Sequence, residues 1–362
     1  MPDNIIYNIL DNENISFNDA LKLYKFLPTS ELMLMAHEIR KRKKPDKIVT
    51  WIIDRNINIS NICVSGCEFC SFYSEHKKNK KSFVTTIEEY KYKIDELFRL
   101  GGSQLLLQGG LNPDFNLSYY ENLFKALKNL FPSLKLHALG PPEVYFLSKL
   151  EKISIVKVLE RLLKAGLDSL PGAGAEILCD RVRKTISPHK CSSAQWLNVM
   201  KQAHKLNMLT TATMMFGHIE TEAERLKHIF KIRDLQHKKP AGSTGFIAFI
   251  PWTFQSPHTK LSEKYPELKK TSTEDYLRTI AISRIILQNI DNIQASWLTT
   301  GTDAAQLALH AGANDLGSIM IEENVVAASG VSRKLSANQM QELIMEAGFE
   351  PRQRNQKYEL IG

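Results

Sequence analysis

Short apolar runs alternate with amphipathic helical stretches along most of this chain, and no other feature constrains its fold as strongly. One helical stretch, Glu88–Leu100, follows a predicted capping box of Thr86 and Glu89 and places Tyr90 and Ile94 on one face. Strands that alternate with helices form βαβ units around a parallel sheet. Eight such units over about 270 residues predict an α/β fold, a (β/α)8 barrel of the TIM type. The predicted strands are Ile57–Cys63, Gln104–Gln108, Leu134–His137, Asp168–Leu170, Thr210–Phe216, Gly245–Phe249, Ile293–Ser296 and Ser318–Ile321.

A doubly wound sheet is the alternative fold. It would place a GxGxxG motif after the first strand, where this chain has a cysteine-rich loop instead. Ahead of the strands, Phe17–Phe26 and Leu32–Arg40 have helical apolar spacing. We therefore expect an N-terminal helical extension over residues 1–50, the barrel over residues 51–325 and a C-terminal helical segment over residues 326–362.

The composition excludes several classes of protein. Of the 362 residues, 43% are hydrophobic and 24% are charged, as in ordinary globular proteins, and no apolar run approaches the roughly 18–20 residues of a membrane span. The net charge is +8, but the lysines lie in short runs without interleaved aromatic residues, so we expect no nucleic-acid partner. The acidic N-terminus lacks the pattern of a signal peptide, which favours a cytoplasmic protein with reduced thiols.

Glycine-rich and polar segments follow the predicted strands, at the end where barrels place their chemistry. Gly109 and Gly110 follow the second strand, GPPE follows the third, PGAGAE the fourth, GHIET the fifth and PWTFQ the sixth. Because the carboxyl ends of barrel strands meet at one rim, the sequence predicts a single composite site over the barrel mouth.

Three of the five cysteines lie within eight residues, as Cys63-x3-Cys67-x2-Cys70. Clustered thiols in a reducing compartment bind metal or react more often than they form disulfides. A structural zinc site needs four ligands, and His76, in a lysine-rich stretch, is the candidate for the fourth. A 4Fe–4S cluster on three cysteines instead leaves one iron without a protein ligand, and an open position is typical of a reactive site. The other two cysteines are too separated for a second cluster and are expected to be small buried hydrophobes.

This cysteine spacing at the end of a first barrel strand, with Phe69 before the last cysteine, resembles the radical S-adenosylmethionine enzymes. The resemblance implies a 4Fe–4S cluster on Cys63, Cys67 and Cys70, whose open iron binds the amino and carboxylate groups of S-adenosylmethionine. It also implies a 5′-deoxyadenosyl radical, released when one electron cleaves that cofactor. The electron would come from a reduced donor such as flavodoxin or ferredoxin.

The same resemblance assigns further residues to the cofactor. Gly109 and Gly110 match the glycine motif whose backbone contacts the methionine amino group, because glycine allows close approach. Glu176 is at the position of a carboxylate on the cofactor ribose. Arg181 or Arg183, just after Glu176, is a candidate to pair with the methionine carboxylate through a bidentate fork, and a surface salt bridge is the alternative for each. The other predicted cofactor-binding residues are Phe69, Tyr73 and Gln108.

Longer segments resemble one subfamily, which holds aminofutalosine synthase, cyclic dehypoxanthine futalosine synthase and the subunits of coenzyme F0 synthase. WIIDRNIN, QLLLQGG and GFIAFIPWTFQ are most similar to the cyclic dehypoxanthine futalosine synthases of menaquinone biosynthesis. That resemblance implies abstraction of the ribose C4′ hydrogen of dehypoxanthine futalosine, radical addition to its aryl ring, and loss of an electron and a proton. One departure is Gly66, where many members carry a basic residue. The sister reactions of the subfamily and a zinc-binding protein without catalysis are the alternatives.

Residues for the substrate are predicted at the strand ends. His137 is a candidate for substrate binding and, with its unperturbed pKa near about 6.5, for accepting the final proton. His218 and Glu220 in GHIET are the other catalytic candidates. Each of these also fits a structural role. The predicted substrate-binding residues are His137, Glu143, Trp252 and Phe254.

Overall fold

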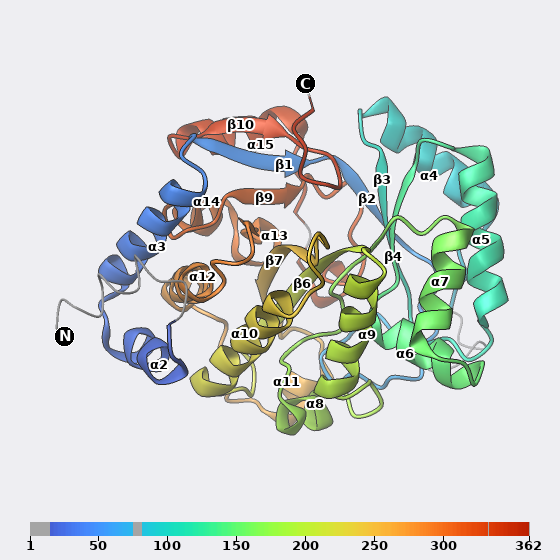
Figure 1. The fold of residues 1–362 in the computed structure, drawn as a ribbon, viewed down its shortest axis with the longest axis horizontal. Helices are drawn as coiled ribbons and strands as arrows, with labels where there is room; N and C mark the ends of the chain where they lie inside the picture. Colours follow the sequence, from blue (N-terminus) through green and yellow to red (C-terminus); the bar gives the residue numbers. More distant parts are fainter. Residues whose placement is uncertain (1–14, 75–81, 332, 362) are drawn as a thin grey trace.

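The computed structural model is organised around a curled sheet of seven parallel strands (Figure 1). The structure describes residues 15–74, 82–331 and 333–361. Strands β2 to β8 pair in chain order, and every pair is parallel. This order confirms the predicted α/β class built from βαβ units. The strands are β2 Asp54–Asn58, β3 Gln104–Gln108, β4 Lys135–Ala138, β5 Ser169–Leu170, β6 Leu209–Phe216, β7 Phe246–Thr253 and β8 Asn292–Ile293.

A second sheet of three parallel strands continues the ring. Its order is β10-β1-β9, with β1 at Ile48–Ile52, β9 at Asp315–Ser318 and β10 at Glu350–Gln353. Only Ile53 separates β1 from β2, so one extended segment belongs to both sheets. On the other side, a single parallel bridge joins Gln294, just after β8, to the first residue of β9. The two sheets therefore form a barrel whose regular part is the seven-stranded sheet.

Several strands differ from the prediction. The first predicted strand, Ile57–Cys63, is β2, which ends at Asn58, so the cysteine loop lies beyond the strand. The eighth, Ser318–Ile321, is β9, which begins at Asp315. Neither β1 nor β10 is among the predicted strands. The sequence of β10 is EPRQ, which carries no apolar signal, because this strand is selected by its pairing with β1 rather than by its own pattern.

Helices cover the outer face of the curled sheet (Figure 1). The predicted capping box is present at the start of α4, where Thr86 and Glu89 bond each other's backbone N–H groups. Along the outside, α5 packs against α7, and α6 packs against α7 and α9. These helices are α4 Ile87–Arg99, α5 Leu117–Leu130, α6 Pro141–Leu150, α7 Ile155–Ala165, α8 Asp180–Ile186, α9 Ser193–Lys205, α10 Glu222–His237, α11 Lys260–Lys264, α12 Thr273–Ile286, α13 Trp297–Thr300 and α14 Thr302–His310.

The terminal segments pack on the side of the barrel. Helices α2 Phe17–Phe26 and α3 Thr29–Lys43 include both helices predicted within residues 1–50, and they pack against α10 and α12 (Figure 1). Near the other terminus, α15 Ala337–Glu346 packs against β10 and α14, after a short 3-10 helix at Ala327–Ser329. Among the described residues, no helix combines the length and apolar character needed to cross a membrane.

Side chains alternate along the strands between the helix layer and the barrel interior. On β3, Leu105 and Leu107 are fully buried on one face, whereas Gln104, Leu106 and Gln108 line an internal cavity. TIM barrels usually fill their interior with bulky branched side chains. Here polar side chains point inward instead and leave open space. On β2, the residues that line the cavity are Asp54, Asn56 and Asn58.

Candidate active site

A cavity of about 400 Å³ runs through the barrel from the cysteine loop to the opposite end. Its lining includes Gln104 and Gln108, the first and last residues of β3. Four residue-to-residue rises of ~3.3 Å span the distance between these two residues, so the cavity is roughly 13 Å deep. The amino ends of the strands form its floor, where Asp54 and Arg354 lie. A cavity of this depth can hold a second molecule beneath one bound at the cysteine loop.

The three cysteines lie together at one end of this cavity. The backbone N–H of Leu111 donates to Sγ of Cys63 at 3.2 Å, and that of Ser65 does so at 3.4 Å. The hydroxyl of Ser65 lies 2.8 Å from Sγ of Cys63 and 3.3 Å from Sγ of Cys67. Burial raises the pKa of Cys67 to about 11, so a metal that binds the thiolate must displace a proton. The N–H and O–H donors suit sulfur atoms that carry negative charge.

The two predicted cofactor glycines differ in what surrounds them. A Cβ added at Gly110 would lie 2.2 Å from the carbonyl oxygen of Ile62 and 2.5 Å from Cβ of Cys63. A Cβ added at Gly109 would approach no atom closer than Cβ of Ile59, at 3.4 Å. Both glycines line the cavity. Gly110 is therefore needed for the close packing of the β3 turn against the cysteine loop.

An ion pair lies beside the cysteines. Nζ of Lys190 is 2.9 Å from Oε1 of Glu176, and it also lies 5.2 Å above the ring of Phe69. Burial lowers the pKa of Lys190, but Cys67 and Glu176 outweigh burial and raise it well above its usual value. Glu176 has a φ of 43°, an unusual conformation that its burial and contacts maintain. Lys190 is not among the predicted site residues, because it lies in a loop without any periodic signal.

Most predicted site residues line the cavity. Nδ1 of His137 lies 2.5 Å from the hydroxyl of Ser169, and burial lowers the pKa of His137 to about 3, so the ring is neutral. The hydroxyl of Tyr73 accepts a hydrogen bond from Lys260 at 2.7 Å. The predicted residues on the cavity lining are Cys63, Cys67, Phe69, Cys70, Tyr73, Gln108, Gly109, Gly110, His137, Glu143, Glu176 and Trp252.

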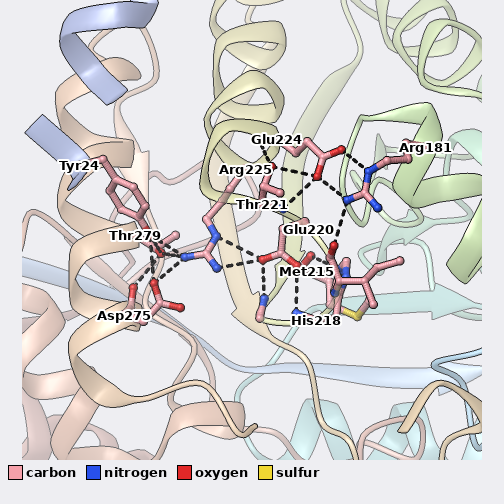
Figure 2. A network of polar contacts seen from close by, with 12 residues as sticks. Tyr24, Arg181, Met215, His218, Glu220, Thr221, Glu224, Arg225, Asp275 and Thr279 are labelled. Atoms are coloured by element: carbon pink, nitrogen blue, oxygen red, sulfur yellow. Dashed lines mark hydrogen bonds and ion pairs between the residues drawn. The ribbon is translucent and has the colours of Figure 1, made fainter. Parts of the chain in front are cut away.

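Two predicted catalytic residues, His218 and Glu220, are absent from this lining. The carboxylate of Glu220 accepts the N–H groups of Gly217 at 2.7 Å and His218 at 2.9 Å, and it pairs with Arg225 at 2.9 Å. Arg225 also bonds Asp275 at 2.6 Å (Figure 2). Gly217 adopts a φ of 85°, and the chain that turns after β6 brings the carboxylate of Glu220 to Arg225 of α10, while the ring of His218 bonds the carbonyl oxygen of Met215. They brace that turn instead of facing the cavity.

The two predicted cofactor arginines and Phe254 are also absent from the lining. Arg181 pairs with Glu224 at 2.6 Å through both Nε and Nη2 on the outside of the barrel (Figure 2). Arg183 is buried and donates to the carbonyl oxygens of Cys191 at 2.7 Å and of Gly174 at 3.1 Å, which fixes the turn after β5. Phe254 is 4% exposed and packs edge-on against a histidine ring.

The cavity floor contains a second buried ion pair, whose residues are also not among the predicted site residues. Nε of Arg354 lies 2.5 Å from Oδ2 of Asp315, and Nη2 lies 3.0 Å from Oδ1. The guanidinium stacks 3.7 Å from the ring centroid of Tyr358. Because Arg354 and Tyr358 both follow β10, the last residues of the chain close the barrel at this end.

Comparisons with known proteins agree with this architecture. The family model of the radical SAM superfamily matches residues 57–232, which include the end of β2, the cysteine loop and the strands from β3 to β6. The chain is therefore a radical S-adenosylmethionine enzyme. A second model, described as the CofH/MqnC C-terminal region, matches residues 243–361. Together with the relatives below, this match shows that the chain belongs to the CofH/MqnC family.

Curated relatives of two activities resemble the chain over nearly its whole length. The cyclic dehypoxanthine futalosine synthase of Streptomyces coelicolor is 42% identical over 95% of this chain and 85% of its own. The cyclic dehypoxanthine futalosine synthase of Halalkalibacterium halodurans is 40% identical over 99% of this chain and 95% of its own. The 5-amino-6-(D-ribitylamino)uracil–L-tyrosine 4-hydroxyphenyl transferase 1 of Methanosarcina acetivorans is 38% identical over 95% of this chain and 90% of its own.

Solved structures share the fold. The FeFe-hydrogenase maturase HydG from Carboxydothermus hydrogenoformans matches with a TM-score of 0.75 at 17% identity, over 98% of this chain and 80% of its own. Methylornithine synthase (PylB) matches with a TM-score of 0.70 at 18% identity, over 97% of both chains. At these identities the likeness concerns the fold alone.

Membership of the superfamily means that the enzyme uses a 4Fe–4S cluster and S-adenosylmethionine. The residues at the cysteine end of the cavity fit both groups. Three thiols face one space, N–H and O–H donors surround Cys63, and a carboxylate held by Lys190 lies beside them. The family thus decides between the iron–sulfur and zinc interpretations of the three cysteines. His76, the candidate fourth zinc ligand, lies outside the described residues.

Proposed function

We propose that this enzyme converts dehypoxanthine futalosine into cyclic dehypoxanthine futalosine in menaquinone biosynthesis. The observation that carries this proposal is the degree of identity to two cyclases, 42% and 40% over nearly the whole chain. The 4-hydroxyphenyl transferases reach 38% or 39% at similar coverage. Transfer of a 4-hydroxyphenyl group from tyrosine to 5-amino-6-(D-ribitylamino)uracil is therefore the second candidate.

The bound cluster and S-adenosylmethionine would supply a 5′-deoxyadenosyl radical at the cysteine end of the cavity. Cys63, Cys67 and Cys70 would hold the cluster. Glu176, which pairs with Lys190 at 2.9 Å, would accept hydrogen bonds from the ribose hydroxyls of the cofactor. The required electron is proposed to come from a reduced donor such as flavodoxin or ferredoxin.

The remaining cavity would position the substrate beneath the cofactor. Its depth of roughly 13 Å suits a molecule with a sugar at one end and an aryl acid at the other. Leu106 and Trp252 on its walls exclude water from the reacting carbons. Holding C4′ against the attacking carbon, and the aryl ring against C4′, is the main contribution that the protein can make to such a reaction.

Product analysis tests the proposal. Anaerobically reconstituted enzyme would be incubated with S-adenosylmethionine, dithionite and dehypoxanthine futalosine, and the mixture analysed by mass spectrometry. The cyclase forms free 5′-deoxyadenosine and a product two hydrogens lighter than the substrate, and Cys67→Ala abolishes both. A parallel reaction with tyrosine and 5-amino-6-(D-ribitylamino)uracil tests the second candidate. Product in that reaction alone would replace the cyclase proposal with the transferase.

A further inference from the structure

The final step of the proposed cyclisation releases a proton, and the chemistry specifies where in the cavity this occurs. The inference rests on the proposed function. The ring carbon that forms the new bond to C4′ is the carbon that loses the proton. C4′ must lie against the 5′ carbon of S-adenosylmethionine, at the cysteine end of the cavity. A proton acceptor must be within hydrogen-bond reach of that ring carbon, so it belongs to the cysteine end and not to the floor.

Four acidic side chains are among the described residues of the cavity lining: Asp54, Glu143, Glu176 and Glu323. Asp54 lies at the floor and accepts a hydrogen bond from a glutamine at 3.0 Å. Glu176 is paired with Lys190. Glu323 accepts three backbone N–H groups of the turn that follows it, at 2.7 to 3.2 Å. These three carboxylates are therefore already engaged in the folded protein.

Glu143 is different. Within the described residues it has no ion pair and no hydrogen bond to another side chain, although it is only 8% exposed and lines the cavity. The sequence GPPE determines its place: Gly140 caps α6, and Pro141 and Pro142 provide no N–H at the first helical positions. The first N–H of the helix is that of Glu143, and its proximity favours the charged form of the residue's own carboxylate and so lowers its pKa. A buried carboxylate with free acceptor positions thus faces the site of reaction.

The surroundings of Glu143 favour proton uptake. Burial raises the pKa of this carboxyl group. The positive charge of Lys190 lowers the pKa, and the negative charge of Glu176 raises it further. The other titratable groups that face it are the hydroxyl of Tyr120 on α5 and the thiol of Cys191. A carboxylate with a raised pKa is a stronger base, and its basicity is better matched to neutral pH.

His137 is the competing base from the sequence analysis, and its position argues against it. Its side chain bonds Ser169, and burial and the nearby Arg354 of the floor lower its pKa to about 3. A neutral imidazole with so low a pKa is a poor proton acceptor. A role in hydrogen bonding to the substrate remains consistent with its place on the lining.

We propose that the carboxylate of Glu143 is the catalytic base that restores the aromatic ring. In this step the C–H bond of the attacked ring carbon breaks, and the proton moves to Glu143. One electron leaves the ring to an iron–sulfur one-electron acceptor. With the hydrogen atom taken earlier from C4′, the substrate loses two hydrogens in all, and the new carbon–carbon bond is retained.

The test compares wild type with Glu143→Gln and Glu143→Asp. Glutamine keeps the size and removes the base, whereas aspartate keeps the base on a shorter side chain. Glu160→Gln, on the exposed surface of α7, is the matched control. For each protein, 5′-deoxyadenosine and cyclised product are measured from mildly acidic to alkaline pH, and samples frozen during turnover are examined by electron paramagnetic resonance.

Glu143→Gln should form 5′-deoxyadenosine at close to the wild-type rate, because the first abstraction does not use Glu143. Its product per 5′-deoxyadenosine should fall by about 10²-fold and lose the pH dependence of wild type, and a substrate radical should accumulate. Glu143→Asp should recover part of the product. An unchanged product ratio in Glu143→Gln would overturn the proposal, and so would equal loss of 5′-deoxyadenosine and product, which indicates cofactor binding. If wild type cleaves the cofactor without cyclising the substrate, the proposed function itself fails.

Discussion

Replacing Gly110 by alanine should prevent the cysteine loop from taking the position in which it holds iron. The added Cβ would lie 2.2 Å from the carbonyl oxygen of Ile62 and 2.5 Å from Cβ of Cys63. Neither atom belongs to the far end of a flexible side chain, so relief of the contact requires the loop backbone to move. Overpacking of this kind costs about 1–3 kcal/mol. For a chain of 362 residues that corresponds to a thermal unfolding midpoint lowered by roughly 1–4 °C.

The assay pairs Gly110→Ala with Gly109→Ala, where the added Cβ meets no atom closer than 3.4 Å. Both variants are reconstituted anaerobically with iron and sulfide, and iron per chain, cluster absorbance and thermal unfolding are measured. We expect Gly110→Ala to hold much less iron and to unfold at lower temperature, and Gly109→Ala to match wild type in both measurements. Full iron loading of Gly110→Ala, or equal losses in the two variants, would refute the reasoning.

Ion pairs outside the cysteine loop allow three further tests. Arg181→Ala should lower the free energy of unfolding by at most about 1 kcal/mol and leave the affinity for S-adenosylmethionine unchanged in calorimetric titration; a large loss of affinity would return Arg181 to the cofactor site. Hydrogen bonds from Arg181 lower the pKa of Glu224 to about 2. The contribution of Glu224 to the free energy of unfolding is therefore complete at pH values above its pKa in the unfolded chain, about 4.3, and is lost as the pH falls toward 2. Urea unfolding of wild type and Glu224→Gln should therefore converge in acid, and a constant difference would contradict this. Arg354→Met leaves the fully buried Asp315 unpaired and should cost about 3–5 kcal/mol by chemical denaturation, while adding Asp315→Leu should recover most of it. A double variant as unstable as the single one would argue against the ion pair as the cause.

Elements with a regular apolar pattern could be predicted from the sequence. Helix Phe17–Phe26 and strand Gln104–Gln108 have the predicted bounds, because each carries its periodicity within its own residues. Strand β10 could not be predicted in this way. Its residues, EPRQ, are polar and form a strand only because β1 offers a free edge.

The same distinction applies to the site. The cysteines could be identified because their spacing along one loop is itself the signal. Lys190 could not, since its role depends on a turn that brings it to Glu176, 2.9 Å away. His218 follows a strand, as rim residues of a barrel do, but the backbone turn at Gly217 directs it elsewhere. Position along the chain therefore predicts the rim, while the direction of each side chain depends on local backbone angles.

The pairing of β1 with β10 has a consequence for how the protein is made. Ile48 pairs with Glu350, so β1 leaves the ribosome about 300 residues before the strand with which it pairs. Contacts between residues so distant in sequence form late, because the entropy of closing a long loop must be overcome first. Until then, β1 presents an unpaired edge to its surroundings, and such edges promote association with other chains. The synthesis of β10 thus ends the period during which this edge of the nascent enzyme is prone to aggregate.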